Sequence, residues 1–441
     1  MVTLGLDLGT TTVSAVIVET STGNVLATRT RKSGADLPSP VPGEKCQDPR
    51  ILTELAAGLV NQLLEQYPQV SAIGITGQMH GIVYLDKEGN CVSPLYTWQD
   101  QRAASFCREL SERTGYRIAP GYGLATHYAL MQSGSVDPRA EKLCTIMDYM
   151  AFLLCGKEKL LMHASNAASL GFFSLKSGTF DRTALQKAEI DPNLLPEVTR
   201  DTVIQGYYHG IPVAVAIGDN QASFLGSVPC PETTALINFG TGSQISRMVS
   251  SLPEDWEDDR LEIRPYLEDS FLICGSALCG GRAYALLEGF FRRFLARSGV
   301  QTDSCYSLLN TLAAEGLTLP DLPNMETTFC GTRWDPDKRG SLTDLNESNF
   351  TPEALCAATL LGMARELQQL LLGMPGEPVR ILTASGNAVQ ENPALLQAII
   401  RVFGIPAELS GRREEAAYGA ARFANATGLP APLFSENVTF P

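Results

Sequence analysis

The 441-residue chain lacks the features that mark membrane-spanning, secreted and metal-thiolate proteins. No stretch approaches the roughly 20 consecutive apolar residues that a membrane-spanning helix needs. The N-terminus has no basic region followed by an apolar core and a cleavage site, so we expect no secretory signal. None of the 11 cysteines forms a Cys-x-x-Cys pair, which argues against a metal-thiolate site and a disulfide framework. We therefore expect reduced thiols, a cytoplasmic location and no membrane partner.

Positive charge is also scarce, because 34 lysines and arginines stand against 48 aspartates and glutamates, for a net charge of −14. Such a chain has little electrostatic attraction for nucleic acid, so we expect no nucleic-acid partner. Any anionic ligand must be held by local features such as backbone amides. The sequence also lacks a Gly-x-x-x-x-Gly-Lys-Ser/Thr loop and a Gly-x-Gly-x-x-Gly motif with its downstream acid. Neither a P-loop nor a dinucleotide-binding fold is indicated.

Strand-like runs alternate with helical stretches along most of the chain, which predicts an α/β protein of two or three domains. Residues 51–67 carry apolar side chains at helical spacing and are followed by the strand-like "VSAIGITG". Residues 354–374 show the same spacing and precede "VRILTASGN".

The order of these pieces repeats within the chain. "DLGTTTVSAVI" (residues 7–17) resembles "NFGTGSQISRM" (238–248), and "VSAIGITGQ" (70–78) resembles "VRILTASGN" (379–387). In each half a small-residue hairpin precedes a helix, which precedes a strand that ends in a glycine turn. The repeat predicts two similar lobes facing one another. Chance similarity between short glycine hairpins is the alternative.

The first hairpin has the chemistry of a phosphate site. Backbone N–H groups and threonine hydroxyls at residues 9–12 form a set of donors suited to phosphate oxygens, and glycine permits close approach. Asp7 repels phosphate, so its carboxylate is best explained as a ligand of Mg²⁺. One Gly-Thr hairpin alone would suggest an ordinary turn. Two hairpins together with an aspartate favour phosphate binding.

Asp219 follows the apolar run "VAVAIG" (213–218) and precedes a small-residue helix. A carboxylate lifted out of the core at this place could take the proton of an alcohol during phosphoryl transfer. The alternative is that Asp219 is only a helix N-cap.

Two further segments, "GQMHG" (77–81) and "YTWQDQR" (96–102), concentrate polar side chains around an aromatic ring. Together they offer the donors and acceptors that a polyhydroxylated ligand needs. His80 could equally be a hydrogen-bonded structural histidine. The runs "SNAAS" (165–169) and "GYGLAT" (121–126) are weaker signals, because small-residue runs usually indicate close packing.

These motifs resemble those of the FGGY carbohydrate kinases. "DLGTTTVSA", "GQMHG", "WQDQR", "GDNQA", "NFGTGS", "FCGTRWDPDKRG", "ASGNAVQENP" and "REEAAYGAA" occur in the order seen in that family and cover nearly the whole chain. The resemblance implies two actin-like (ribonuclease H-like) lobes, residues 1–226 and 227–441, with a cleft between them. It also implies transfer of the γ-phosphate of ATP to a sugar hydroxyl, with Mg²⁺ as cofactor, and leaves a homodimer open.

The resemblance further implies a role for individual residues. It makes Asp219 the catalytic base and places Asp7 and Asp219 beside Mg²⁺. The residues implied to face the phosphates are Gly9, Thr10, Thr11, Thr12, Gly240, Thr241, Gly242 and Ser243, and those implied to border the adenosine are Gly386 and Asn387. The residues implied to line the sugar are Gln78, Met79, His80, Trp98, Asp100, Arg102 and Asp219.

Within the family, "GQMHG" is similar to the motif of ketose kinases, and Gln99 stands where xylulose kinases usually have asparagine. "GYGLATHYAL", "TIMDYMAFLLCG", "SNAASLGFF" and "ASGNAVQENP" are most similar to kinases of sedoheptulose, which is the expected substrate, with D-xylulose as the alternative. Thr332 replaces a glutamate frequent in the family, and Asn387 interrupts a glycine run. A rival interpretation is an actin-like, sugar-responsive regulator without transfer activity.

Overall fold

The computed structural model describes residues 1–254 and 256–425, which form two compact units. Among the described residues, unit 1 consists of Met1–Gly226, Pro265–Asp269 and the segment from Glu414 to Asn425, and unit 2 consists of Ser227–Arg264 and Ser270–Arg413. The sequence predicts one boundary, between residues 226 and 227. The units share that boundary, but two later segments join unit 1. Residues 426–441 of the predicted second lobe lie outside the described residues.

Unit 1 is built on a six-stranded sheet with the order β14-β15-β6-β1-β2-β3. β1 pairs antiparallel with β2 and parallel with β6, so the predicted N-terminal hairpin is confirmed. The strands are β1 (Val2–Leu8), β2 (Thr12–Glu19), β3 (Asn24–Lys32), β6 (Val70–Gly77), β14 (Ile204–Tyr208) and β15 (Ile211–Ala214).

Unit 2 is built on a second six-stranded sheet with the order β18-β19-β17-β16-β22-β23. β16 pairs antiparallel with β17 and parallel with β22. The strands are β16 (Thr234–Phe239), β17 (Ser243–Val249), β18 (Leu261–Pro265), β19 (Phe271–Ala277), β22 (Ile381–Ser385) and β23 (Ala407–Leu409).

The internal repeat is present in the topology of the two sheets. The order β6-β1-β2-β3 in unit 1 corresponds to β22-β16-β17-β19 in unit 2, with the same parallel and antiparallel pairings. In each unit a long helix directly precedes the parallel strand, namely α1 (Pro49–Gln66) before β6 and α10 (Pro352–Leu372) before β22, although in unit 2 further strands and helices lie between the hairpin and α10. Both helices begin with proline after a side-chain N-cap, Asp48 or Thr351, which is a strong helix-start signal.

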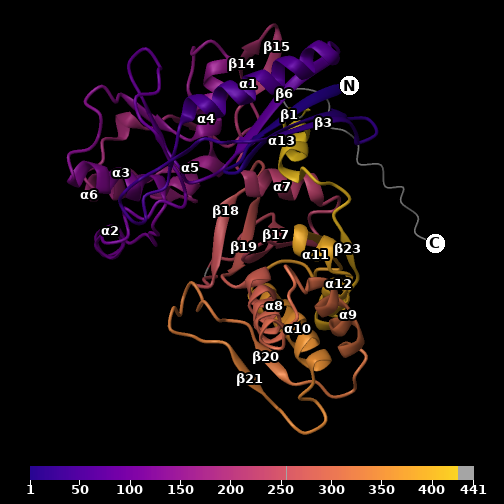
Figure 1. Cartoon of the computed structure of the whole chain (residues 1–441). Coiled ribbons are helices and arrows are strands. Elements are labelled where there is room, and N and C mark those ends of the chain that lie inside the picture. The colour runs from indigo at the N-terminus through magenta and orange to yellow at the C-terminus, as the bar shows by residue number, and fades with distance from the viewer. Residues whose placement is uncertain (255, 426–441) are drawn as a thin grey trace. The chain divides into compact units, whose positions relative to one another are not determined.

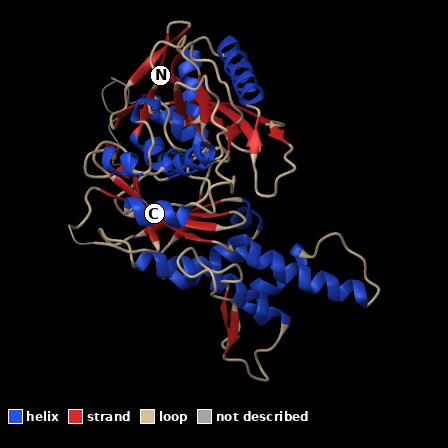
Figure 2. Ribbon diagram, turned by 90° about the vertical axis from the view of Figure 1, so that its left-hand side faces the viewer, coloured by secondary structure: helices blue, strands red, loops and turns tan. Residues whose placement is uncertain are grey.

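The remaining helices and strands range from two to 18 residues in length. Helices of unit 1 are α2 (Cys107–Thr114), α3 (Gly123–Gln132), α4 (Ile146–Leu154), α5 (Ala164–Leu170), α6 (Arg182–Lys187), η1 (Pro192–Leu194), α7 (Asp219–Ser227) and α13 (Glu415–Asn425). Helices of unit 2 are α8 (Gly280–Arg297), α9 (Tyr306–Gly316), α11 (Asn387–Glu391) and α12 (Pro393–Phe403), and in Figure 2 the helices of the chain are blue and the strands red. One three-stranded sheet is formed by β4 (Asp36–Leu37), β5 (Cys46–Gln47) and β8 (Leu95–Tyr96). Three two-stranded sheets of unit 1 pair β7 (Val83–Leu85) with β9 (Lys142–Cys144), β10 (Leu161–His163) with β13 (Glu197–Thr199), and β11 (Phe173–Ser174) with β12 (Thr179–Phe180). In unit 2, β20 (Asn324–Glu326) pairs with β21 (Ser341–Thr343).

The sheet of unit 1 is covered on both faces, as its nearly continuous apolar strands require. Alternate residues of β2, such as Ala15 and Ile17, pack in one cluster with α1, whereas Val16 and Val18 pack against α13. Figure 1 shows α13, in yellow, beside β1. The helix approaches closely because two strand residues are glycines. A Cβ on Gly5 would lie 1.8 Å from the carbonyl oxygen of Ala417.

The same helix fixes the position of α7. A Cβ on Gly419 of α13 would lie 1.8 Å from the carbonyl oxygen of Ala222 in α7, and one on Gly226 would lie 2.2 Å from the carbonyl oxygen of Glu415. These glycines allow the two helix backbones to touch, so α7 is set directly against α13. Among the described residues, no helix has the length and apolar character needed to cross a membrane.

Candidate active site

The first hairpin, between β1 and β2, is fixed by hydrogen bonds from Ser33 and Gln47 to its backbone carbonyls. The Thr10 carbonyl accepts hydrogen bonds from Ser33 Oγ and Gln47 Nε2, both at 2.8 Å, and the Thr11 carbonyl accepts one from Ser33 N at 2.9 Å. Because C=O and N–H of one peptide point in opposite directions, the Thr11 N–H is turned away from Ser33 and Gln47. The hairpin therefore has the fixed backbone that a phosphate site needs.

Two predicted sugar-site residues, Gln78 and Trp98, contact this hairpin. Leu8 and Gly77 are register partners in the parallel strands β1 and β6, so the residues that follow each strand emerge at the same sheet edge. Thr10 Oγ1 donates to Gln78 Oε1 at 3.4 Å, and Trp98 Nε1 donates to Thr10 Oγ1 at 3.0 Å. The hairpin and the two polar segments thus form one cluster within unit 1.

His80 occupies a strained turn directly after β6. Its φ of +71° lies in the left-handed region that non-glycine residues rarely adopt. Ser169 Oγ accepts from the His80 N–H at 3.1 Å, and the Ser169 carbonyl lies 2.7 Å from His80 Nδ1. Because a carbonyl can only accept, Nδ1 carries the proton, and in the neutral ring Nε2 is an acceptor. The ring stacks on Tyr122 with centroids 5.0 Å apart.

Asp219 is the first residue of α7. The Gly218 carbonyl accepts from Ala222 N at 2.9 Å, so Gly218 stands at the start of the helix and Asp219 lies in its first turn. The strand predicted to end at Gly218 is shorter than expected, because β15 ends at Ala214. A Cβ on Gly218 would lie 2.8 Å from Met79 Sδ, so the turn before Asp219 packs on a predicted sugar-site residue.

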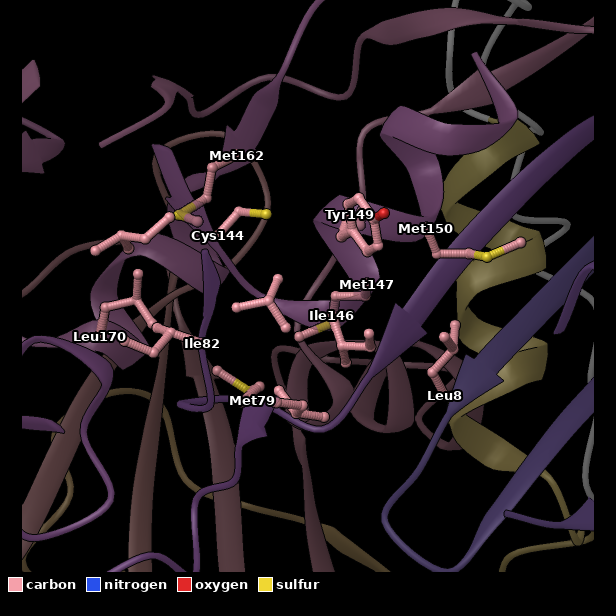
Figure 3. Packing of buried hydrophobic residues seen from close by; sticks show 14 of the residues in the cluster. Leu8, Met79, Ile82, Cys144, Ile146, Met147, Tyr149, Met150, Met162 and Leu170 are labelled. Atoms are coloured by element: carbon pink, nitrogen blue, oxygen red, sulfur yellow. The ribbon is translucent and has the colours of Figure 1, made fainter. Parts of the chain in front are cut away.

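Met79 itself belongs to the hydrophobic core of unit 1. It is 4% exposed, and Figure 3 shows it in the same buried cluster as Ile82 and Leu170. Its sulfur reaches the turn before Asp219, while its neighbour His80 faces Tyr122 and Ser169. The core therefore supports the polar cluster directly.

Asp7 lies under the electrostatic influence of two other carboxylates at this end of the sheet. Burial raises the pKa of Asp7 to about 7, and the negative charges of Asp219 and Glu414 add to that rise. Glu414 also accepts a hydrogen bond from Thr30 Oγ1 at 2.9 Å. No group of three or more His, Cys, Asp or Glu side chains in residues 1–254 and 256–425 has the arrangement of a complete protein metal site. One or two carboxylates that share Mg²⁺ with water and substrate phosphates are the usual arrangement for this ion, and Asp7 with Asp219 fits it.

Asp100 and Arg102 are directed toward each other. Asp100 is completely buried and accepts from Arg102 Nε and Nη2 at 2.8 and 3.0 Å and from Lys45 N at 2.9 Å. The Arg102 guanidinium also lies 4.6 Å from the ring centroid of Tyr96 and 3.5 Å from Glu44. In this structure the pair holds the loop that carries Trp98, and its contact with a sugar stays a prediction.

A polar cavity of about 470 Å³ borders this loop. Thr10 and Gln99 line it, together with charged residues of the segment 36–46 such as Asp36, Glu44 and Lys45. It therefore combines hydroxyl, amide and charged groups of both signs next to the first hairpin.

In unit 2 the second hairpin lies against the first turn of α8. Gly281 N donates to the Gly240 carbonyl at 3.0 Å, and Arg282 N donates to the Thr241 carbonyl at 3.1 Å. A Cβ on Gly280 would lie 2.5 Å from the carbonyl carbon of Gly242. The predicted phosphate-facing residues 240–243 therefore stand beside the N-terminus of an 18-residue helix, where the helix dipole favours anions.

The predicted adenosine residues follow the neighbouring strand. Gly386 has a φ of +93°, and a Cβ there would lie 2.3 Å from the Phe239 carbonyl oxygen, so only glycine fits this turn. Asn387 begins α11. Asn238 Nδ2 donates to Ser385 Oγ at 2.9 Å and ties the ends of β16 and β22 together. The hairpin and this turn are thus neighbours within unit 2.

A cavity of about 230 Å³ opens next to this turn. Its lining includes the stacked rings of Tyr284 and Tyr306, whose centroids lie 6.1 Å apart, along with Gly281, Ala388 and Asn310. Asn310 Nδ2 donates to the Glu391 carbonyl at 3.2 Å. Its Oδ1 is buried and accepts no hydrogen bond from the described residues. Aromatic faces with a polar amide suit a flat nitrogen heterocycle.

Thr332, one of the departures from the family pattern, is structural. It is 3% exposed, its Oγ1 accepts from Asp335 N at 2.9 Å, and its N–H donates to the Asp335 carbonyl at 2.8 Å. The threonine therefore closes a tight turn on its own.

Several residues of these clusters carried no clear signal in the sequence. Gln47, Tyr122 and Ser169 belong to the unit 1 cluster through hydrogen bonds or ring contacts, and Tyr284 and Asn310 line the unit 2 cavity. Only Tyr122 and Ser169 lie in runs that the sequence analysis singled out. Glu414 could have been found from the motif "REEAAYGAA", which the analysis quoted without assigning a role.

Comparison with known protein families agrees with the motif order. The N-terminal domain model of the FGGY family of carbohydrate kinases matches residues 2–226, and its C-terminal domain model matches residues 267–427. The chain therefore belongs to the FGGY family of carbohydrate kinases, and it is an ATP-dependent kinase with the actin-like, ribonuclease H-like fold of that family.

Individual relatives are similar over nearly their full length. A sedoheptulokinase of Mus musculus is 28% identical over 95% of this chain and 96% of its own, and a glycerol kinase of Aquifex aeolicus is 27% identical over 96% and 89%. Among solved structures, a xylulose kinase of Rhodospirillum rubrum superposes with a TM-score of 0.82 at 22% identity, covering 96% of this chain and 89% of that one.

Proposed function

We propose that this kinase transfers the γ-phosphate of ATP to the primary hydroxyl of sedoheptulose and forms sedoheptulose 7-phosphate. The observation that carries the proposal is the cluster in unit 1, where Gly218, directly before Asp219, packs on Met79, and Asp219 lies near enough to Asp7 to raise the pKa of Asp7. A base, a second carboxylate and hydrogen-bonding side chains are what phosphoryl transfer to a polyol needs. The choice of sugar is supported by the similarity to sedoheptulokinase over 95% of the chain.

In the proposed reaction the Asp219 carboxylate accepts the proton of the sugar hydroxyl. The hydroxyl oxygen then forms a bond to the γ-phosphorus while the bond from that phosphorus to the β-bridging oxygen breaks, and ADP leaves. His80 Nε2, an acceptor in the neutral tautomer, binds a further sugar hydroxyl, and Gln78 orients the ligand. Asp7 and Asp219 would hold Mg²⁺, which supplies neutralisation of phosphate charge when bound.

We assign the nucleotide to two places on the chain. Thr10 to Thr12 of unit 1 and the hairpin 240–243 of unit 2 donate to phosphate oxygens. The adenine enters the 230 Å³ cavity of unit 2, where its exocyclic amine donates to Asn310 Oδ1. This assignment is supported by the adjacent turn at Gly386 and by the two tyrosine rings that line the cavity.

The test is ADP release from Mg²⁺-ATP with sedoheptulose, D-xylulose, D-ribulose, L-ribulose, glycerol or gluconate. Asp219→Asn should lower turnover by about 10²- to 10⁴-fold, the range of a lost general base, while ATP binding remains. Asp137→Asn is the matched control, because Asp137 pairs with Arg139 at the surface. Substantial turnover by Asp219→Asn would remove this residue from the role of base.

D-Xylulose is the second candidate substrate, favoured by the sequence similarity to a xylulose kinase that is 26% identical over 97% of this chain. Preference for it in the same assay would keep the mechanism and correct the sugar. No sugar-dependent ADP release with any of the six compounds would favour the rival regulator. The cytoplasmic location and a homodimer stay predictions.

A further inference from the structure

The short helix α5 touches both chemically important turns of unit 1, although neither is near it in the sequence. Its residues are Ala164–Leu170, and both Ser165 and Asn166 are completely buried. Ser165 lies 53 positions from Gly218, and Ser169 lies 89 positions from His80. This small-residue run is predicted to pack closely and is part of a motif similar to kinases of sedoheptulose, but neither the prediction nor the proposed function gives its individual residues a role.

The first turn held by α5 is the one that precedes Asp219. Ser165 Oγ accepts from the Gly218 N–H at 3.0 Å, and Asn166 Nδ2 donates to the Ala216 carbonyl at 3.1 Å. Between them, Ile217 N donates to the Ile75 carbonyl of β6 at 3.0 Å. Three consecutive residues are thus tied down just before Asp219, in a stretch that lies outside the strand β15.

The hydroxyl of Ser165 is itself oriented by a chain of hydrogen bonds. His163 Nε2 faces the Arg200 carbonyl at 3.2 Å, so it carries the proton, and Nδ1 accepts from Ser165 N at 3.2 Å and from Ser165 Oγ at 2.8 Å. The Ser165 oxygen is therefore left to accept from Gly218 N–H. Burial lowers the pKa of His163 to about 4, which keeps the ring neutral at physiological pH.

Asn166 is oriented in the same way. Asp148, a completely buried residue of α4, accepts from Asn166 Nδ2 at 2.9 Å. Because the Ala216 carbonyl can only accept a hydrogen bond, it selects the NH₂ group of Asn166, and the same NH₂ group contacts Asp148.

The second turn held by α5 is the strained one at His80. Ser169 contributes two contacts, its hydroxyl to the His80 N–H and its carbonyl to His80 Nδ1. The Ser169 hydroxyl donates in turn to the Asn166 carbonyl at 2.7 Å, so it is available to His80 N–H only as an acceptor. A non-glycine residue at a φ of +71° persists only where its surroundings hold it, and Ser169 supplies that restraint.

We propose that α5 is the positioning element of the active site, with Ser165 and Asn166 setting the place of Asp219, and Ser169 setting the ring and tautomer of His80. The inference rests on the proposed function for the roles of Asp219 and His80. These are positioning residues, because they act through other side chains. Displacement of a reacting group by about 1 Å can cost on the order of 100-fold in rate, so a lost restraint has a kinetic effect beyond its effect on stability.

Alanine substitutions of Ser165 and Ser169 should have different effects on the steady-state kinetic constants. Ser165→Ala should lower kcat at least about tenfold and leave KM for ATP and for the sugar within about twofold, because Asp219 moves while the hairpins and the other sugar-binding side chains keep their places. Ser169→Ala should raise KM for the sugar about five- to tenfold and leave KM for ATP unchanged. Ser93→Ala is the matched control. Ser93 Oγ also accepts a hydrogen bond from a backbone N–H of unit 1, that of Tyr84 at 2.9 Å, but this bond holds neither of the two turns.

Hydrogen exchange followed by mass spectrometry gives a readout that does not need activity. Ser165→Ala should accelerate exchange in peptides covering residues 216–219, and Ser93→Ala should not. Unchanged exchange there, or kinetic constants of both serine variants within twofold of wild type, would overturn the inference. Wild-type enzyme inactive on every sugar would refute the proposed function, and the exchange result would still decide whether Ser165 restrains this turn.

Discussion

The contact between β1 and α13 allows a sharp test, because one methyl group added to Gly5 meets backbone. The new Cβ would lie 1.8 Å from the Ala417 carbonyl oxygen and 2.8 Å from Ala421 N, whereas real Cβ contacts essentially never fall below 3.0 Å. The helix must therefore move by at least about 1.2 Å, the difference between 3.0 and 1.8 Å. Overpacking costs typically about 1–3 kcal/mol, and we expect about 3 kcal/mol because a helix backbone cannot rotate aside as a side chain can.

The assay is calorimetric thermal unfolding of the full chain. For a unit of this size, about 3 kcal/mol corresponds to a fall of roughly 6–12 °C in the melting temperature of the transition that includes unit 1. Gly58→Ala is the matched control, since Gly58 is exposed in α1 with nothing within 4 Å of its added Cβ. Alanine is better than glycine in a helix by about 1 kcal/mol, so this variant should melt higher. A Gly5→Ala transition within about 2 °C of wild type would refute the packing argument.

Three further predictions concern charge, nucleotide and metal. Burial raises the pKa of Asp148 from 3.8 to about 7, so folding favours its protonated form and stability falls as pH rises from about 4 to about 7. Urea unfolding at pH 5 and pH 8 should show Asp148→Asn gaining on wild type at the higher pH, and parallel pH profiles would contradict this. Asn310→Ala should raise KM for ATP about five- to tenfold, the effect of one lost hydrogen bond, with KM for the sugar unchanged in the same assay. A chelator should stop ADP release, and added Mg²⁺ should restore it. Asp7→Asn should need a higher free Mg²⁺ concentration than wild type for half-maximal ADP release, and an unchanged Mg²⁺ dependence would count against Asp7 as a ligand.

Much of the architecture could be predicted because its signals are local. The hairpins 7–17 and 238–248 and the long helices near residues 51–67 and 354–374 follow from apolar spacing, turn residues and N-caps that are adjacent in the chain. β15 ended earlier than predicted, since an apolar run does not reveal where a strand loses its pairing partner and continues as a buried turn.

The functional details depended on contacts between distant segments. Asp100 and Arg102 look like ligand-binding groups in the sequence, yet the buried Asp100 forms an ion pair with the partly buried Arg102, one residue away along the chain. Ser165 and Ser169 look like packing residues, yet they form hydrogen bonds to the turns at Gly218 and His80, which lie 53 and 89 positions away in the sequence. Tertiary packing decides which polar side chains face a ligand and which face the protein. The periodicity of the sequence alone does not reveal this.

The return of the chain to its first strand has a consequence for biosynthesis. Unit 1 needs α13, whose buried residues cover β1 and β6, but α13 is translated only after all of unit 2. A nascent chain that has reached residue 413 therefore exposes the glycine-lined face of the first sheet while unit 2 already has its complete sequence. The unit whose first strand is synthesised first is therefore also the unit whose last covering helix is synthesised last.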